Sequence, residues 1–317
     1  MPLRAVQPDR YEALLSAKSA RVGQLLRPWY EGEFDLYPSA PTGYRMRAEF
    51  RIWHEGERLD YVMFSRENPR KPMPIEAFPI ACEAIQVLMP VLRAELQDSP
   101  ELRRKLFQVE FLSTLAGDTL VTLIYHRKLE HGWQEQAEAL RSRLTALVPQ
   151  LSLIGRSRKQ KLVLGRDWVV EELQVEGNRY LYRQYEQAFT QPNARINIQM
   201  IEWACARARG LRGDLLELYC GNGNFTLPLA RHFDSVIATE LAKTSVRAAR
   251  ENIAANSAIN IEIIRLAAEE VTQAIQRERE FRRLSELPRP LHEYDLRSVF
   301  VDPPRAGLDP ATVAMVS

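Results

Sequence analysis

The sequence predicts an α/β fold, and three observations in its C-terminal half support that prediction. The short apolar run Asp214-Leu-Leu-Glu-Leu218 leads into a loop with Gly221 and Gly223, after which an apolar stretch resumes. A second apolar run ends at Glu240, and a third ends at Asp302-Pro-Pro. Buried strands that end in a glycine loop and in carboxylates are typical of a Rossmann-like parallel sheet that holds a nucleotide-like ligand.

The glycine loop narrows the choice of ligand. The residues Cys220-Gly-Asn-Gly-Asn-Phe225 lack the third glycine of the nicotinamide- and flavin-binding pattern. No Lys-Ser or Lys-Thr pair follows the glycines, which argues against a phosphate-binding Walker loop. Glu240 stands about twenty residues further on, where a carboxylate accepts hydrogen bonds from both ribose hydroxyls. These elements are similar to those of S-adenosylmethionine methyltransferases. They predict the cofactor residues Gly221, Gly223, Glu240 and Asp302.

Length and composition set wider bounds. The 317 residues are enough for two domains, and 45% hydrophobic and 26% charged residues are ordinary for a soluble globular protein. No apolar run approaches the roughly twenty residues of a membrane span, and the N-terminus lacks an apolar signal core, so we expect a cytoplasmic protein with no membrane partner. Cys82, Cys205 and Cys220 form no Cys-x-x-Cys pair, so no metal site is expected.

The N-terminal half is predicted to be an α+β domain with an antiparallel sheet. Residues 44–53 alternate with period two, so one face of this strand is apolar. The opposite face carries Arg45, Arg47, Glu49, Arg51 and Trp53. Residues 106–112 and 119–125 are expected to form one hairpin, and residues 151–165 another.

Basic side chains recur around these strands. Basic triplets flank the first hairpin, and Arg158 and Lys159 lie within the second. Each cluster alone is typical of a solvated strand edge. Because the net charge is only +2, a nucleic-acid site has to come from such local clusters, and several of them beside a methyltransferase-like core favour RNA as the substrate. Phe107 is interpreted either as a platform for an unstacked base or as a core side chain with Val109 and Phe111.

Four helices are predicted from apolar spacing. They cover residues 9–26 with Asp9 as the N-cap, residues 75–97 with interruptions at Pro79 and Pro90, residues 133–147, and residues 193–208. The domain boundary is expected in the polar stretch 171–187, which divides the chain into an RNA-binding domain, 1–180, and a methyltransferase domain, 181–317.

Several motifs carry a resemblance to one family. They are Tyr44-Arg-Met-Arg-Ala-Glu-Phe-Arg-Ile-Trp53, Lys105-Leu-Phe-Gln108, Phe189-Thr-Gln-Pro-Asn193, Leu215 to Phe225, and Val301-Asp-Pro-Pro-Arg-Ala-Gly-Leu308. With these motifs the chain resembles the tRNA (uracil-5-)-methyltransferases that form the 5-methyluridine of the T loop. The related rRNA enzymes typically add an oligonucleotide-binding domain and, in many members, a four-cysteine cluster. This sequence shows neither.

The resemblance implies a cofactor, a partner and site residues. The cofactor is S-adenosyl-L-methionine, and the partner is the T arm of tRNA, with tmRNA as a further substrate of a monomeric enzyme. By resemblance the cofactor residues are Gln191, Tyr219, Asn224, Glu240 and Asp302. The residues turned toward RNA are Arg51, Phe107 and Arg305, to which the basic pattern adds Arg45, Arg47, Arg158 and Lys159.

The resemblance also implies a mechanism. In this family a cysteine thiolate adds to carbon 6 of uracil, carbon 5 then takes the methyl group, and a glutamate removes the carbon 5 proton. Both groups are expected after the strand that ends at Asp302, beyond Ser317. We therefore expect a methyltransferase domain that is incomplete at its C-terminus, with no catalytic residue in this chain, which alone is inactive. Cys82, Cys205 and Cys220 are expected to be small buried residues.

Three alternatives stay open beside this interpretation. The first is a catalytically inert tRNA-binding fragment, and the second is a methyltransferase that acts on another RNA, such as rRNA or tmRNA. The third is methylation of an exocyclic amine, which Arg305 disfavours because such enzymes usually carry an aromatic residue after the two prolines.

Overall fold

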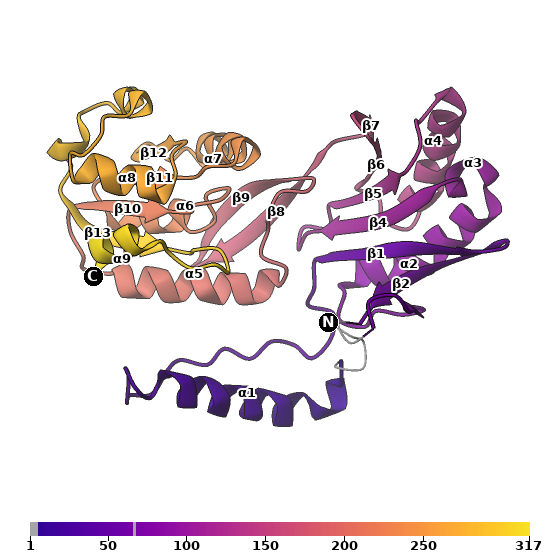
Figure 1. The fold of residues 1–317 in the computed structure, drawn as a ribbon, viewed down its shortest axis with the longest axis horizontal. Coiled ribbons are helices and arrows are strands. Elements are labelled where there is room, and N and C mark those ends of the chain that lie inside the picture. Colours follow the sequence, from indigo (N-terminus) through magenta and orange to yellow (C-terminus); the bar gives the residue numbers. More distant parts are fainter. Residues whose placement is uncertain (1–5, 66–67) are drawn as a thin grey trace. The chain divides into compact units, whose positions relative to one another are not determined.

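The computed structural model describes residues 6–65 and 68–317, which form two compact units. The first unit comprises the chain up to Val169 together with Gln191–Ile196, and the second comprises Val170–Thr190 with Asn197–Ser317. Both are mixtures of helices and strands (Figure 1), which confirms the predicted α/β fold class. No helix of the described ranges is long and apolar enough to cross a membrane.

The described part of the first unit contains a seven-stranded sheet in the order β3-β2-β1-β4-β5-β6-β7. All neighbouring strands are antiparallel except β5 and β6. The strands are β1 (Arg47–Glu55), β2 (Arg58–Phe64), β3 (Pro72–Pro74), β4 (Leu106–Ser113), β5 (Thr119–Tyr125), β6 (Leu151–Ser157) and β7 (Gln160–Leu164). The helices are η2 (Pro8–Arg10), α1 (Tyr11–Leu26), α2 (Glu83–Asp98), α3 (Pro100–Arg103) and α4 (His131–Thr145). Both predicted hairpins are therefore confirmed.

One face of this sheet forms the main core, as the alternation in residues 44–53 predicts. Met46, Ala48, Phe50 and Ile52 are buried, and the ring of Phe50 lies 5.3 Å from that of Tyr61 and 5.2 Å from that of Phe78. Helices α2 and α4 cover this face with apolar stripes, because apolar residues three and four apart share one side of a helix. The buried stripe residues are Ile85, Leu88, Met89, Leu92 and Leu96 of α2 and Trp133, Ala137, Leu140 and Leu144 of α4.

Two details of the predicted helices are wrong. Asp9 lies inside the 3₁₀ helix η2, so the N-cap of α1 is Arg10, which makes no side-chain cap hydrogen bond. The predicted helix 75–97 begins only at Glu83, because Pro79 lacks an N–H and disfavours a helical conformation at the residue before it. Pro90, in contrast, lies inside α2, and the short helix α3 was not expected.

The second unit is built on a parallel four-stranded sheet in the order β12-β11-β10-β13. Its strands are β10 (Asp214–Leu218), β11 (Val236–Thr239), β12 (Ile261–Ile264) and β13 (Leu296–Val301), and β10, β11 and β13 confirm the three predicted runs. The helices are α5 (Ala194–Ala208), α6 (Thr226–Leu229), η3 (Ala230–His232), α7 (Lys243–Ala255), α8 (Ala268–Ile275), η4 (Arg282–Glu286), η5 (Leu291–Glu293) and α9 (Pro310–Val316). The predicted helix 193–208 is thus confirmed, with the side chain of Asn193 accepting from the N–H of Ile196.

The polar stretch 171–187 is not irregular. Most of it belongs to the hairpin of β8 (Trp168–Val175) and β9 (Asn178–Tyr185), whose turn residues Glu176 and Gly177 have φ angles of 47° and 76°. Two consecutive left-handed residues match the right-handed twist of paired strands. The alternating burial of β8 shows that one side of this hairpin packs inward although its sequence is rich in polar residues.

A close contact in the first unit yields a stability prediction. A Cβ atom on Gly155 of β6 would lie 2.2 Å from Cη2 of the buried Trp133 and 2.8 Å from Cδ1 of Leu129. We expect Gly155→Ala to lower the free energy of unfolding by about 1–3 kcal/mol, measured by urea denaturation.

Gly132→Ala is the matched control, because a Cβ there meets no heavy atom within 4 Å. Since alanine favours a helix more than glycine does, this variant should be as stable as the natural protein or slightly more stable. Equal effects of the two substitutions would contradict the packing argument.

Candidate functional site

The glycine loop follows directly after β10. Tyr219, Gly221 and Gly223 have φ angles of 61°, 58° and 86°, so the chain turns sharply before α6 begins. Glycine adopts a left-handed conformation without strain, whereas a tyrosine does so only when its surroundings hold it there. Tyr219 is half-buried and packs against the apolar cluster beside Leu218, and burial raises the pKa of its hydroxyl.

Glu240 is joined to this loop by hydrogen bonds. The N–H of Gly221 donates to Oε2 of Glu240 over 3.1 Å, and the N–H groups of Leu241 and Ala242 donate to Oε1 over 2.8 and 2.7 Å. Three backbone donors therefore fix the carboxylate at the end of β11. Oε1 accepts two of these hydrogen bonds and Oε2 accepts one, so Oε2 keeps a further lone pair that can accept a hydrogen bond from a ribose hydroxyl.

The sheet register places three of the predicted residues at one edge. Leu218, Thr239 and Val301 are partners across β11-β10-β13. Because these strands are parallel, the residues that follow them, Tyr219, Glu240 and Asp302, leave the sheet at the same edge. Partial burial raises the pKa of Asp302 above its ordinary value. Gln191 belongs to the first unit and is half-buried.

A third acid, Glu217, was not singled out from the sequence. It is the penultimate residue of β10 and only 1% exposed. Burial raises the pKa of its carboxyl to about 8, and the nearby charge of Asp302 adds to this effect. Glu217 is therefore mainly protonated at neutral pH. The one available signal was a single acid inside the apolar run 214–218.

The amide group of Asn224 is already engaged within the second unit. Its Nδ2 donates to Oδ1 of Asn197 over 2.8 Å, and Nδ2 of Asn197 donates back to Oδ1 of Asn224 over 2.8 Å. The side chain of Asn224 therefore points toward α5. If Asn224 contributes to cofactor binding as predicted, this geometry favours a contribution through the position of its backbone.

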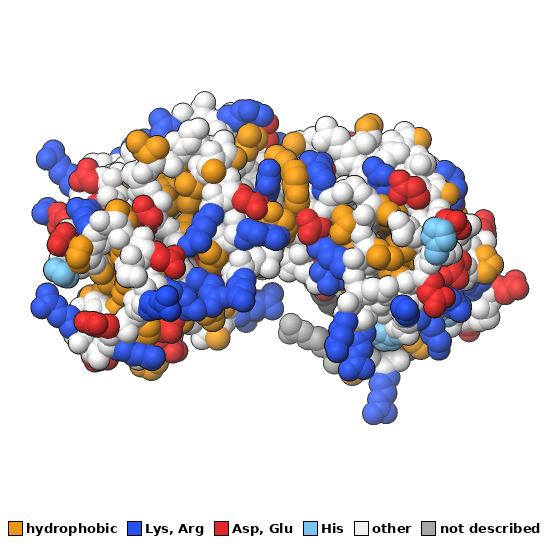
Figure 2. All heavy atoms as spheres, turned by 90° about the horizontal axis from the view of Figure 1, so that it is seen from above, with side chains coloured by type: hydrophobic (Ala, Val, Ile, Leu, Met, Phe, Trp, Pro, Cys, Tyr) orange, Lys and Arg blue, Asp and Glu red, His pale blue; other side chains and the backbone are white. Residues whose placement is uncertain are grey.

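The outer face of the first unit's sheet carries the predicted RNA residues. Strand registers place one row of side chains across it, namely Arg51, Gln108, Ile124, Arg156 and Lys161. The adjacent row contains the acids Glu49 and Glu110, and Arg47 lies 3.9 Å from Glu110. On the side of the molecule that Figure 2 draws, blue Lys and Arg side chains stand among red Asp and Glu side chains. The row that contains Arg51, Arg156 and Lys161 is therefore basic, and the adjacent row of the same face carries acidic side chains.

Phe107 lies outside the core, so the core interpretation is wrong. A register shift between Leu106 and Gln108 leaves Phe107 without a partner on β5, and such a bulge turns it away from the face of Val109. The guanidinium of Arg51 lies 3.8 Å from the centre of its ring, and the His126 ring is stacked at 3.9 Å. Two groups this close occupy opposite faces of the ring. An RNA base would reach Phe107 only after one of them moves.

The remaining predicted RNA residues occupy different places. Arg158 and Lys159 are exposed at the turn between β6 and β7. Arg45 is half-buried just before β1, and its neighbour Tyr44 is also half-buried. Arg305 belongs to the second unit and is exposed in the segment after β13. The structure therefore brings Arg51 and Phe107 into contact and places Arg47 on the same face of β1 as Arg51.

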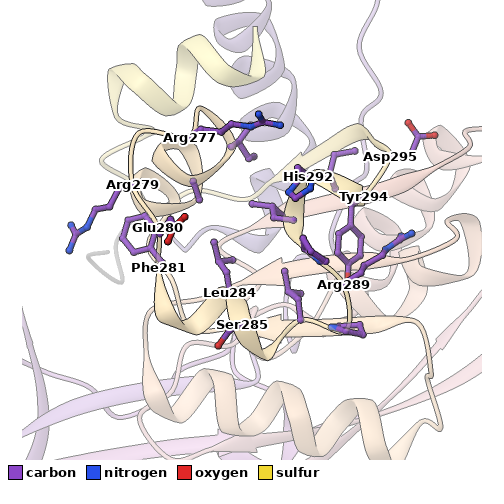
Figure 3. A pocket seen from close by; sticks show the side chains of 17 residues that line it. Arg277, Arg279, Glu280, Phe281, Leu284, Ser285, Arg289, His292, Tyr294 and Asp295 are labelled. Atoms are coloured by element: carbon purple, nitrogen blue, oxygen red, sulfur yellow. The ribbon is translucent and has the colours of Figure 1, made fainter.

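A pocket of the second unit lies elsewhere. It has a volume of about 770 Å³ and is lined by residues between Ala274 and Leu296 (Figure 3). Arg289, one of its lining residues, donates to Oδ2 of Asp214 over 2.8 Å and lies 4.0 Å from the centre of the Tyr294 ring. Because Asp214 begins β10, this pocket lies at the amino ends of the parallel strands. Ligands of such sheets bind at the carboxyl ends, so this pocket is not the candidate site.

The three cysteines are buried, as expected. Burial raises the pKa of Cys205 to about 11 and that of Cys220 well above its ordinary value. Thiols with raised pKa values are poor nucleophiles at neutral pH, because the thiolate is the reactive form. Ligand atoms of Cys205, Glu176 and His232 lie within 4.8 Å of one another, although Glu176 also pairs with Arg209.

Fold and site together define a class. A parallel sheet with a glycine loop after its first strand and an acid after the second is the architecture of Rossmann-like methyltransferases. The structure is similar to that of the Pyrococcus abyssi tRNA (uracil-54, C5)-methyltransferase, with a TM-score of 0.67 and 17% identity, over 96% of this chain and 69% of that one. This similarity confirms the fold.

Sequence comparisons identify the family. The tRNA (Uracil-5-)-methyltransferase family profile matches residues 10–317. A tRNA/tmRNA (uracil-C(5))-methyltransferase of Aromatoleum aromaticum is 49% identical over 99% of this chain and 84% of its own length. One of Vibrio parahaemolyticus is 50% identical over 98% of this chain and 84% of its own length. The chain belongs to the tRNA (uracil-5-)-methyltransferase family, which confirms the resemblance.

Glu217 yields a prediction about pH and stability. Its carboxyl has a pKa of about 8 when folded and 4.5 as the ordinary value. Below the lower value it is protonated in both states. As the pH rises from 4.5 to about 8, only the unfolded chain releases the proton. The free energy of unfolding therefore falls by up to about 5 kcal/mol over this range. We expect Glu217→Gln to flatten this decline, measured by urea denaturation at about pH 5 and about pH 8.

Asp234→Asn is the control, because Asp234 is an exposed acid of the same unit. It should leave the pH dependence unchanged. A decline in Glu217→Gln as steep as in the natural protein would show that other groups cause it.

Proposed function

We propose that this chain binds S-adenosyl-L-methionine at the carboxyl edge of β10, β11 and β13. The observation that supports this most strongly is the Glu240 carboxylate, which three N–H groups hold beside the glycine loop. The bound cofactor would supply an electrophilic methyl group. The P. abyssi protein of similar fold is described in complex with S-adenosyl-L-homocysteine, the demethylated form. Gly221, Gly223, Tyr219 and Asp302 are the proposed neighbours of the ligand, and Gln191 is proposed from the resemblance alone.

We propose that the acceptor is carbon 5 of a uridine in the T loop of tRNA, with tmRNA as a further substrate. Family membership and the names of the relatives support this acceptor. The sheet face around Arg47, Arg51 and Phe107 supports RNA contact, because guanidinium groups pair with phosphates and stack on bases. Arg305, Arg158, Lys159 and Arg45 are proposed as further contacts. We place the enzyme in the cytoplasm as a monomer.

The proposed chemistry requires a thiolate and a base. Carbon 5 of uracil becomes nucleophilic once a thiolate has added to carbon 6, and a carboxylate then removes the carbon 5 proton. Burial argues against each of Cys82, Cys205 and Cys220 as this thiolate, and the raised pKa values argue further against Cys205 and Cys220. We therefore propose that none of the three is the nucleophile.

The second candidate function is tRNA binding without catalysis. The same buried thiols favour it, since residues 1–317 then lack an active nucleophile. The comparisons give no support to such inactivity, because the relatives match 99% and 98% of the chain. Transfer of labelled methyl groups by residues 1–317 would exclude this second function.

The first prediction here concerns that transfer. We expect labelled methyl from S-adenosyl-L-methionine to reach unmodified tRNA in the presence of a full-length relative, and to fall to background when the T-loop uridine is replaced by cytidine. Residues 1–317 alone are expected to transfer none, because no accessible thiolate is present.

The triple variant Cys82→Ser, Cys205→Ser and Cys220→Ser tests the role of the cysteines directly. It should bind tRNA and S-adenosyl-L-homocysteine as tightly as the natural protein, provided that it stays folded. Transfer by residues 1–317 that disappears on replacing a single one of these cysteines would refute the proposed roles.

The second prediction concerns RNA binding. We expect Arg47→Gln with Arg51→Gln to weaken tRNA binding about 10-fold or more at physiological salt, and to make it less salt-dependent, because two phosphate-neutralising charges are lost. Filter binding across a salt series measures both effects.

The matched control is Arg141→Gln with Arg143→Gln. It removes the same charge from α4, which covers the opposite face of the sheet, where both arginines pair with glutamates. Its tRNA affinity should stay close to that of the natural protein. Equal losses of tRNA affinity in both double variants would mean that the affinity depends on net charge and not on this face of the sheet.

A further inference from the structure

The conformation of the glycine loop depends on its neighbours. Tyr219, Gly221 and Gly223 are left-handed, and the tyrosine among them is strained in that conformation. Glycines also leave a chain free to adopt many other conformations. A loop of this composition keeps one shape only if other elements hold it.

The side chain of Asn224 supplies one such attachment. Its amide forms a reciprocal pair with Asn197, with both donor–acceptor distances at 2.8 Å. Asn197 lies on α5 and is 5% exposed, whereas Asn224 is half-buried, so the pair is partly shielded from water. An amide pair of this kind satisfies one donor and one acceptor on each side chain. Because it is directional, it fixes Asn224 relative to α5.

Two further side chains hold the loop backbone. The hydroxyl of Tyr182, on β9, donates to the carbonyl oxygen of Asn224 over 3.0 Å. Nδ2 of Asn252, on α7, donates to the carbonyl oxygen of Asn222 over 2.9 Å. Tyr182 and Asn252 are both fully buried, and burial raises the pKa of Tyr182 so that it remains a donor. Helix α5, strand β9 and helix α7 thus each contribute a side chain that forms hydrogen bonds with the loop.

The loop also forms a hydrogen bond with a residue of the proposed ligand site. The N–H of Gly221 donates to Glu240, whose carboxylate is proposed to accept hydrogen bonds from the ribose. A displacement of Asn224 would therefore move the backbone that also sets the position of the Glu240 carboxylate. Preorganised sites bind more tightly because less free energy is spent on ordering the loop when the ligand arrives.

We propose that Asn197 is a positioning residue of the cofactor site: its amide pair with Asn224, together with the Tyr182 hydroxyl, holds the glycine loop in its ligand-binding conformation. Asn197 acts through Asn224 and does not touch the ligand. The inference rests on the proposed function, since it assumes that this loop binds S-adenosyl-L-methionine.

Calorimetric titration with S-adenosyl-L-homocysteine tests the proposal on the whole chain. We expect Asn197→Leu to bind about 10- to 100-fold more weakly than the natural protein, because the half-buried amide of Asn224 loses both hydrogen bonds of the pair. Asn197→Asp keeps an acceptor for Nδ2 of Asn224 and should recover part of the affinity. Tyr182→Phe removes one hydroxyl without changing shape and should also weaken binding, which keeps the test valid if Asn197→Leu does not fold.

Asn256→Leu is the matched control. Asn256 bonds the N–H and carbonyl of Leu181 over 2.9 and 2.7 Å, so it joins α7 to the same strand β9 without a hydrogen bond to the loop. This variant should lower the melting temperature and leave the affinity unchanged at temperatures where it is folded. Hydrogen exchange at residues 221–225 should accelerate in Asn197→Leu and Tyr182→Phe and stay unchanged in Asn256→Leu.

Each outcome distinguishes the inference from the function on which it rests. A natural protein that does not bind S-adenosyl-L-homocysteine overturns both. A natural protein that binds, with unchanged affinity in folded Asn197→Leu and Tyr182→Phe, overturns only the positioning role. A loss in Asn256→Leu as large as in Asn197→Leu also overturns it, since the effect then reflects general destabilisation.

Discussion

The candidate site depends on the parallel register of three strands. Leu218 of β10 is level with Thr239 of β11 and Val301 of β13, so the chain leaves all three strands at one edge. Tyr219, Glu240 and Asp302 meet there for that reason alone. A shift of one residue in any pairing would turn the buried side chains of that strand to the other face of the sheet. The fully buried pattern of β10 and β11 resists such a shift.

The charges at this edge favour one kind of ligand. Glu240 and Asp302 supply carboxyl groups, and the buried Glu217 lies beneath them with a raised pKa. A phosphate group would be repelled by carboxylates, whereas the sulfonium and ammonium groups of S-adenosyl-L-methionine would be attracted. The glycine loop alone is compatible with many nucleotides, so the acids around it contribute the selectivity that the loop lacks.

The sequence predicted regular elements better than irregular ones. Alternation in residues 44–53 and the apolar runs at 215–219 and 236–239 reflect burial, which a pattern records directly. The start of α2 at Glu83 and the hairpin at β8 and β9 were missed, because polar and proline-containing stretches bury side chains without a simple period. Phe107 was ambiguous because its orientation depends on a bulge, which is a property of the pairing with β5 and not of β4 alone.

The same distinction applies to the site residues. Glycines and acids that end strands were recognisable, because their backbone and charge requirements are local. Asn197 and Tyr182 were not, since each acts on a loop 27 or 42 residues away along the chain through one directional hydrogen bond or amide pair. Nothing in their immediate sequence distinguishes them from ordinary helix and strand residues. Residues that hold a binding loop from behind become visible only when the partner of each buried polar group is known, because a buried amide or hydroxyl requires one.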